Sequence, residues 1–483
     1  MTPNLFSFLR RILFIYQQEL YDSAKLLSFF YSKRILENPE KRQEIEWTIK
    51  TKPYYILTIG LFLSLYIATI IQFWWKSTLI LFLFKSIILY FLLLFFLPFF
   101  LITSQVILNP LDYFLKQKRI KKAQETYLQH KEHLQVIAIT GSFGKTSIKE
   151  LLQNILKEKY SVISTPENKN TPLGFCEFAD TISASHQILI VEMGAYQKGD
   201  IQEMCDLIKP DYGVLTGINE QHLERFGSLQ NTVEAKNELS SSIPKSGILW
   251  VNEENKTAKD SAPKYARCEI EFYNTNNVQD IQYSDDGSQI IALTTEKNIC
   301  HSSLSGISIH SPFLASYFPL FCDLAFKVGK AFDVNEKQVI RDLEKMKPAP
   351  HRLFPTYYKE TDILIIDDSY NGNSDGALAA MKTLARFHNK HRIYLTPGLV
   401  ELGDKSDEVH EMIGKNLAFN CDEIWLIKTS VTDAILKGLK KSKFDESKIR
   451  IFPKDTDAHR AMRKELKAGT VLLIQNDWTD NYC

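Results

Sequence analysis

The chain has 483 residues, which is more than one ordinary domain and favours two or three. Its 58 lysines and arginines balance 57 aspartates and glutamates, so the net charge of +1 gives no general argument for nucleic-acid binding. Seven scattered cysteines, with no CxxC pair and no metal-binding spacing, exclude a complete set of internal disulfides and favour reduced cytosolic thiols.

Residues 1–52 form a basic N-terminal region. Its segment LFSFLRRILFIY, residues 5–16, suits an amphipathic helix on a membrane surface and equally an ordinary packed helix, and both interpretations stay open. The apolar runs begin too far from the N-terminus, and are too long, for a cleaved signal peptide.

Two long apolar runs follow, at 54–75 and 79–102. Each exceeds the roughly 20 residues that a helix needs to cross a bilayer, so residues 53–104 predict a two-helix transmembrane hairpin. A buried hairpin in a soluble protein is the alternative. Basic residues flank both outer ends of the hairpin, whereas its turn carries one lysine, Lys76. This asymmetry predicts two spans in the cytoplasmic membrane, with both termini and the domains that follow the hairpin cytosolic. Residues 105–130 are expected to be a basic linker, either solvated or near lipid headgroups.

The stretch VIAITGSFGKTSIKELL, residues 136–152, predicts a strand, a glycine-bearing turn and a helix. Glycines let backbone N–H groups converge on phosphate oxygens at a helix N-terminus. Lys145 is then expected on the nucleotide phosphates, and the Thr146 hydroxyl on Mg²⁺. The remaining residues of this candidate nucleotide site are Gly141, Ser142, Gly144 and Ser147. The match is imperfect, since Ile139 stands where the general motif has its first glycine.

Further segments extend the pattern in chain order. They are ENKNTPLG (167–174), VEMGAYQKGDI (191–201), LTGINEQHLERFGS (215–228), EAKNEL (234–239), HRL (351–353), IIDDSYNGN (365–373) and PGLVELGD (397–404). With the phosphate loop they resemble the Mur ligase family over residues 131–475. The resemblance implies an α/β protein with a central ATP-binding domain, 131–346, and a C-terminal Rossmann-like domain, 347–483. It also implies an ATP- and Mg²⁺-dependent enzyme that activates a peptide carboxylate as an acyl phosphate for attack by an amine.

The resemblance assigns roles to particular side chains. Glu192, at the end of the apolar strand ILIVE, and His222 match metal ligands that act with Thr146. Lys236 matches the family's carbamate-bearing lysine, whose anionic form helps to hold a cation. On sequence alone, Glu192 is also compatible with a solvated strand end, and Lys236 with a helix surface.

Other matched residues concern the substrates. Asn168, Asn170 and Thr171 are expected to face the acceptor, although a simple turn also explains them. Arg352 matches an arginine that reaches the nucleotide, which suits its forked guanidinium. Asp368 and Asn371 follow a buried strand, where parallel sheets bind ligands, and are further nucleotide candidates. The implied partners are a UDP- or lipid-linked muramoyl peptide, an amine such as D-alanyl-D-alanine, the membrane, and other wall-synthesis enzymes.

The sequence also departs from the family. The hairpin occupies the place of the usual UDP-sugar domain, which favours a lipid-linked acceptor. The segment 311–332 lacks the family's adenine-side asparagines and instead carries Tyr317, Phe318 and Phe321, which suit either adenine stacking or the core. The final segment 475–482 lacks a lysine-glycine-serine stretch, which leaves the amine donor open. Two alternatives therefore stay open: an amidating ligase supplied by a glutaminase partner, and a non-catalytic membrane scaffold with a vestigial nucleotide site.

Overall fold

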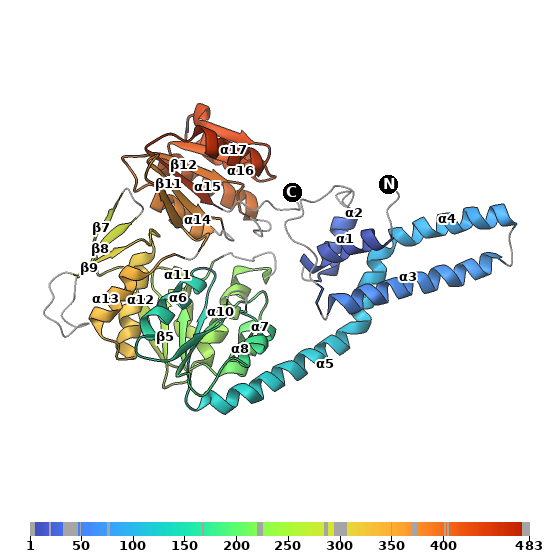
Figure 1. The fold of residues 1–483 in the computed structure, drawn as a ribbon, viewed down its shortest axis with the longest axis horizontal. Helices are drawn as coiled ribbons and strands as arrows, with labels where there is room; N and C mark the ends of the chain where they lie inside the picture. Colours follow the sequence, from blue (N-terminus) through green and yellow to red (C-terminus); the bar gives the residue numbers. More distant parts are fainter. Residues whose placement is uncertain are drawn as a thin grey trace. The chain divides into compact units, whose positions relative to one another are not determined.

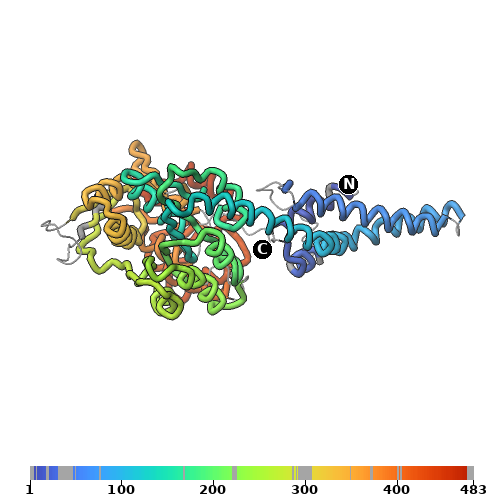
Figure 2. The backbone as a smooth tube through the Cα atoms, turned by 90° about the horizontal axis from the view of Figure 1, so that it is seen from below, coloured from blue at the N-terminus to red at the C-terminus, as the bar shows by residue number. Residues whose placement is uncertain are grey.

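The structure, a computed structural model, divides the chain into two compact units that meet in sequence at Arg119 and Ile120 (Figures 1 and 2). It describes residues 5–18, 21–31, 47–48, 50–74, 78–166, 169–219, 226–284, 288–293, 307–348, 350–369, 374–399, 402 and 405–475.

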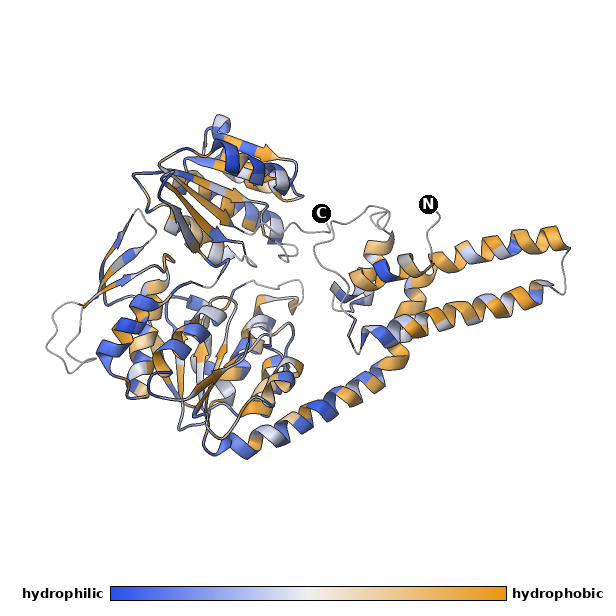
Figure 3. Ribbon diagram, in the orientation of Figure 1, coloured by the Kyte–Doolittle hydropathy of each residue, from blue (hydrophilic) through white to orange (hydrophobic). Residues whose placement is uncertain are grey.

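The first unit is helical. It comprises α1 (Leu5–Gln18), α2 (Ser23–Tyr31), α3 (Thr51–Trp74), α4 (Leu79–Phe95) and the first part of α5 (Leu97–Lys131). Its core gathers side chains such as Leu9 and Tyr16 of α1, Tyr54 and Phe62 of α3, and Leu101 of α5. Outside this core, α3 and α4 are hydrophobic along most of their length (Figure 3). Among the described helices, α3 by itself is long and apolar enough to cross a membrane, judged by length and composition.

The second apolar run does not form the single helix predicted over 79–102. Helix α4 ends at Phe95, α5 begins at Leu97, and the two axes differ by 58°. Pro98 explains the break, because proline lacks an N–H and its ring clashes with the carbonyl four residues earlier in a continuous helix. A two-helix transmembrane hairpin is therefore not confirmed: α4 and α5 reach the length and composition of a span only as a bent pair. The predicted linker segment 105–130 lies within helix α5.

The second unit begins with an α/β domain built on a six-stranded parallel sheet, in the order β2-β3-β1-β4-β5-β6. Its strands are β1 (Gln135–Thr140), β2 (Val162–Ser164), β3 (Ile188–Glu192), β4 (Tyr212–Leu215), β5 (Ile248–Asn252) and β6 (Glu269–Tyr273). Its helices are α6 (Lys145–Leu156), α7 (Pro172–Ala179), α8 (Asp200–Ile208), α10 (Leu229–Ser242), α11 (Lys256–Tyr265), α12 (Phe318–Ala331) and α13 (Glu336–Lys345).

Strand β1 shows why this sheet is covered on both faces. Ile137 and Ile139 join the core that contains α6 and α12, whereas Val136 and Ala138 join the core that contains α7, α8 and α10. Alternate side chains point to opposite faces of a strand, so an apolar run such as QVIAIT needs cover on both sides. A separate antiparallel sheet follows, made of β7 (Val278–Tyr283), β8 (Gln289–Leu293) and β9 (Ile307–Ser311).

The C-terminal domain repeats the α/β design with a second six-stranded sheet, ordered β10-β11-β15-β12-β13-β14. Only β10 runs antiparallel to its neighbour among these described strands. The strands are β10 (Phe354–Tyr358), β11 (Ile363–Asp368), β12 (His391–Thr396), β13 (Glu423–Ile427), β14 (Ile449–Phe452) and β15 (Thr470–Gln475). The helices are α14 (Ser374–Leu384), α15 (Ser406–Asn420), α16 (Thr432–Lys441), the short η3 (Glu446–Lys448) and α17 (Asp455–Glu465). The predicted α/β fold class with a Rossmann-like terminal domain is confirmed.

Candidate active site

The loop between β1 and α6 has the backbone of an anion cradle. Gly141 and Gly144 adopt φ values of 148° and 74°, in the left-handed region that favours glycine. A Cβ on Gly141 would lie 2.0 Å from the Thr216 hydroxyl, so the close approach also requires glycine there. Gly144 caps α6 without a side-chain hydrogen bond, which leaves backbone N–H groups of the first helical turn available to an anion.

Lys145 lies at the start of α6, and its ammonium donates a 2.8 Å hydrogen bond to the Gly141 carbonyl. Burial lowers the pKa of Lys145; nearby Glu192 opposes this shift and Arg352 adds to it. The loop carbonyl thus holds the Lys145 amino group at the place where the sequence predicts phosphate groups.

Thr146 and Glu192 come together beside the loop. The Thr146 hydroxyl donates a 3.0 Å hydrogen bond to Glu192 Oε2, and both side chains are buried. Strand pairing aligns Glu192, the last residue of β3, with Ile139 near the end of β1. A hydroxyl and a carboxylate are hard oxygen donors of the kind that Mg²⁺ prefers, so this pair fits a magnesium site. The third predicted metal ligand, His222, lies outside the described residues.

Lys236 is buried on α10, and the structure does not place it on a helix surface. Burial and repulsion from Lys145 lower the pKa of Lys236 to about 7. A lysine with this pKa is about half neutral at pH 7. Because a neutral amine is the form that adds to CO₂, the site suits the predicted carbamate.

The acceptor segment is partly described. Asn168 lies outside the described residues. The Asn170 carbonyl accepts a 2.9 Å hydrogen bond from Gly194 N, so this segment meets the loop that follows Glu192. Thr171 caps α7, with its hydroxyl accepting from Gly174 N at 3.2 Å. The Thr171 side chain therefore stabilises a helix start.

Arg352 lies on the turn that precedes β10, and its Nη2 reaches Thr146 Oγ1 at 3.5 Å. Its two neighbours, His351 and Leu353, adopt φ values of 63° and 49°. Such values strain residues with a Cβ and need support from their surroundings. The support comes from β11: His351 Nδ1 lies 2.7 Å from Asp367 Oδ2, and Leu353 N donates to Asp368 Oδ1 at 3.1 Å.

Asp368 has therefore a structural contact in addition to its predicted nucleotide role. Burial raises the pKa of Asp368 to about 8, against the lowering effects of the Leu353 N–H and Arg352. The carboxyl is thus largely protonated at neutral pH and presents an O–H donor. The other candidate on this segment, Asn371, lies outside the described residues.

Sequence reasoning missed Asn219 and Asp375, which connect the two α/β domains. Asn219 N donates to Ser142 Oγ at 3.2 Å, and Asn219 Nδ2 donates to Asp375 Oδ2 at 2.9 Å. The sequence contained a signal that Asn219 belongs to the site, since Asn219 lies inside the LTGINEQHLERFGS motif. Asp375 follows the IIDDSYNGN motif and had no signal of its own.

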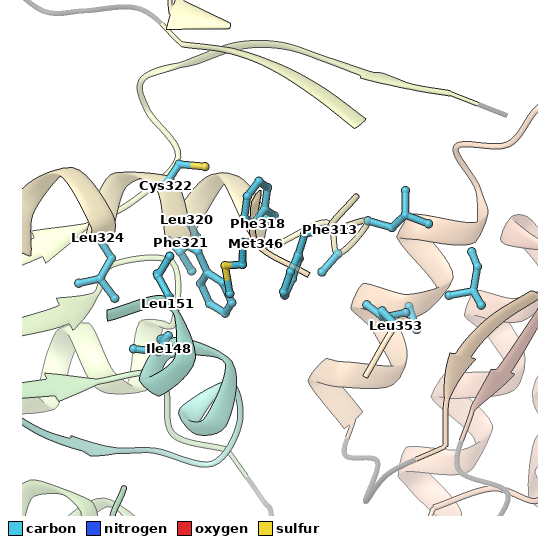
Figure 4. Packing of buried hydrophobic residues seen from close by; sticks show 14 of the residues in the cluster. Ile148, Leu151, Phe313, Phe318, Leu320, Phe321, Cys322, Leu324, Met346 and Leu353 are labelled. Atoms are coloured by element: carbon cyan, nitrogen blue, oxygen red, sulfur yellow. The ribbon is translucent and has the colours of Figure 1, made fainter. Parts of the chain in front are cut away.

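Of the three aromatic residues that replace the expected asparagines, Phe318 and Phe321 lie in the core, and Tyr317 packs against it half-buried. Phe318 and Phe321 are buried, and the Phe313 and Phe318 rings stack with centroids 5.0 Å apart. Figure 4 shows Phe321 near Ile148 and Leu151 of α6. The Phe321 ring would lie 3.8 Å from a Cβ on Gly144, so it supports the phosphate loop from behind.

A glycine-bearing loop between a parallel strand and a helix, with lysine and threonine at the helix start, defines the class of phosphate-loop proteins. Comparison with known families narrows the class. The Mur ligase middle domain matches residues 139–317, and the Mur ligase glutamate ligase domain matches residues 351–475. The chain belongs to the Mur ligase family.

Curated relatives and solved structures agree with this assignment. The UDP-N-acetylmuramoyl-tripeptide–D-alanyl-D-alanine ligase of Haemophilus influenzae is 26% identical over 60% of this chain and 62% of its own length. The Escherichia coli ligase of the same name is also 26% identical, over 64% of this chain and 69% of its own. The chain thus spans somewhat under two thirds of the first of these relatives. MurF ligase from Thermotoga maritima, solved with ADP, has a TM-score of 0.65 and 25% identity, covering 75% of this chain and 80% of its own.

Proposed function

We propose that this chain is an ATP- and Mg²⁺-dependent ligase that joins D-alanyl-D-alanine to a muramoyl tripeptide in peptidoglycan precursor synthesis. The observation that carries the proposal is the convergence of Lys145, Thr146, Glu192 and Arg352 at one phosphate loop. The relatives from H. influenzae and E. coli bear this activity in their names. The T. maritima structure supports ATP as the nucleotide, since that protein was solved with ADP.

The chemistry proceeds in two transfers. A carboxylate oxygen of the acceptor attacks the γ-phosphorus of ATP, ADP leaves, and an acyl phosphate forms. The amine nitrogen then attacks the acyl carbon, phosphate leaves with the C–O bond electrons, and the nitrogen loses a proton. Such phosphoryl transfer needs positioning and neutralisation of charge more than covalent participation by the protein.

The site residues supply those functions. Lys145 exchanges its hydrogen bond with Gly141 for one with the β- and γ-phosphates, and Arg352 offers a second, forked cation. Thr146 and Glu192 would hold Mg²⁺, which would supply neutralisation of the phosphate charge. Lys236, as a carbamate, would add a further anionic group near this cation.

We also propose that the first unit is embedded in the cytoplasmic membrane with the catalytic unit on the cytosolic side. Helix α5 supports this because several of its polar side chains face inward, whereas several of its large apolar side chains face outward. Ser104 accepts from Thr58 at 3.0 Å, Asp112 accepts from Tyr54 at 2.6 Å, and Gln105 bonds to Tyr16. Large apolar side chains on the same helix are more than half exposed, at Val106, Ile107, Leu111 and Phe114.

An arrangement with polar groups inside and apolar groups outside suits lipid as the surrounding solvent. The outward apolar face ends at Leu115, and the basic residues Lys116, Lys118, Arg119, Lys121 and Lys122 follow at headgroup-binding positions. Retention in the membrane pellet after an alkaline carbonate wash tests this placement; release into the supernatant contradicts it.

The acceptor is proposed to be lipid-linked, because a membrane-embedded unit keeps the active site beside a lipid-borne substrate. Turnover is compared on UDP-linked and lipid-linked muramoyl tripeptide with D-alanyl-D-alanine, in nanodiscs. A strong preference for the UDP-linked form contradicts the lipid-linked proposal and leaves the ligase proposal intact.

The ligase proposal is tested by release of phosphate that depends on both acceptor and amine. Lys145→Ala and Glu192→Ala are expected to abolish it, whereas Lys157→Ala, at the exposed end of α6, is a matched control. Stimulation by ammonia in place of D-alanyl-D-alanine indicates an amidating ligase instead. Absence of nucleotide binding and of turnover with any acceptor–amine pair indicates a scaffold.

A further inference from the structure

A second buried lysine lies one helical turn after the phosphate-loop lysine. Lys149 points from α6 into the interior, and its side chain is 5% exposed. Its ammonium donates a 2.8 Å hydrogen bond to the Thr165 carbonyl and lies 3.9 Å from Glu192 Oε2. Burying an ammonium is costly, and its neighbours Ile148, Leu151 and Leu152 show that this part of α6 packs well with apolar side chains. We therefore expect the buried lysine at this position to have a function that offsets this cost.

Besides the direct ion pair, Thr165 provides a second connection between Lys149 and Glu192. The fully buried Thr165 hydroxyl accepts a 3.0 Å hydrogen bond from Glu192 N, and Thr165 N donates to Ile190 O at 3.0 Å. One residue thus contacts Lys149 through its carbonyl and Glu192 through its hydroxyl. Two residues later the acceptor segment 167–174 begins.

We propose that Lys149 is a positioning residue that couples the metal-ligating carboxylate of Glu192 to Thr165, two residues before the acceptor segment. The 3.9 Å separation is too long for a hydrogen bond but still within the range of an ion pair, and both side chains are buried. Attraction from Lys149 restrains the Glu192 carboxylate beside Thr146. This carboxylate already accepts a hydrogen bond from the Thr146 hydroxyl. The same ammonium, through Thr165, fixes the chain just before the acceptor segment. The contacts of Lys149 are with Thr165 and Glu192, so it acts through Glu192.

The inference rests on the proposed function for the identity of the metal site, and its test does not require turnover. Binding of ADP to the purified full chain in nanodiscs is measured by calorimetry with Mg²⁺ and with EDTA. The Mg²⁺-dependent gain in affinity reports on the Thr146–Glu192 site. Lys149→Gln keeps a donor for Thr165 and removes the charge. It is expected to reduce this gain by about tenfold or more, the usual effect of removing an outer partner of a metal ligand.

Metal-free ADP affinity in Lys149→Gln is expected to match that of the unaltered protein, since the phosphate loop is intact. Lys149→Arg is expected to retain most of the gain because it keeps the cation. Lys157→Gln, at the exposed position directly after α6, is the control and is expected to keep the full gain. A full Mg²⁺-dependent gain in a folded Lys149→Gln variant overturns the proposal.

Thr165→Val provides a second route if Lys149→Gln fails to fold. The change removes the hydroxyl that holds Glu192 N and nearly preserves volume, and it is expected to weaken the Mg²⁺-dependent gain as well. An unchanged Mg²⁺-dependent gain in ADP affinity overturns the proposed coupling through Thr165.

With an active preparation, Lys149→Gln is also expected to raise the KM of the acceptor. If the unaltered protein shows a Mg²⁺-dependent gain but no ligation, the proposed function fails while the role of Lys149 is still decided by the calorimetry.

Discussion

Lys236 offers the sharpest prediction, because its environment changes its chemistry by a calculable factor. Its pKa of about 7 compares with 10.5 for an ordinary lysine. At pH 7 the neutral fraction is then about one half, against roughly 0.03% for an exposed lysine, which is a gain of about a thousandfold. Since the neutral amine adds to CO₂, Lys236 is expected to form a carbamate at bicarbonate concentrations that leave the exposed lysines unmodified.

The assay uses carbon-13-enriched bicarbonate and nuclear magnetic resonance of the carbamate carbon. The signal is expected to grow as the pH rises through about 7, because a lowered pKa leaves the amine protonated below that value and neutral above it. Lys236→Met removes the signal, and Lys149→Arg retains it. A signal that persists in Lys236→Met, or none in the unaltered protein across this pH range, refutes the reasoning.

Three further substitutions test other parts of the structure. Asp368→Asn is expected to stabilise the protein near pH 7 and to matter little below pH 4. Folding raises the pKa of Asp368 from 3.8 to about 8. The free energy of unfolding therefore falls as the pH rises through that interval, because the buried carboxyl resists ionisation. Thermal melts at the two pH values check this. Arg352→Lys is expected to lower kcat/KM about a hundredfold, because lysine lacks the forked guanidinium whose Nη2 reaches Thr146, and steady-state kinetics check this. Phe321→Ala is expected to cost about 3–5 kcal/mol of unfolding free energy in urea titrations, because it empties the space behind Gly144. A loss below about 1 kcal/mol contradicts its assignment to the core.

Local features of the sequence were enough to predict the phosphate loop and the α/β class. Glycines at 141 and 144 mark a turn that needs left-handed φ, and the apolar strand ILIVE ends at the site residue Glu192. The resemblance to the Mur ligases rests on the order of the motifs along the chain. This order is kept although the sequence is only 26% identical to that of the H. influenzae ligase.

Other features depend on contacts between distant segments and left little trace in the sequence. Lys149 and Lys236 have the pattern of ordinary helical lysines, and only the packing of α6 and α10 buries them. The support of Arg352 by Asp367 and Asp368 depends on the pairing of β10 with β11. The break between α4 and α5 was signalled by Pro98, but the hydrophobic run around it dominated the prediction.

The central claim is that this chain ligates an amine to a muramoyl peptide at the expense of ATP. The most direct measurement is mass analysis of the products formed by the full chain in nanodiscs with ATP, Mg²⁺, D-alanyl-D-alanine and muramoyl tripeptide. A pentapeptide product is expected, formed with one phosphate released per bond and absent in Lys145→Ala. A chain that binds nucleotide but yields no ligated product from UDP-linked or lipid-linked acceptors contradicts it.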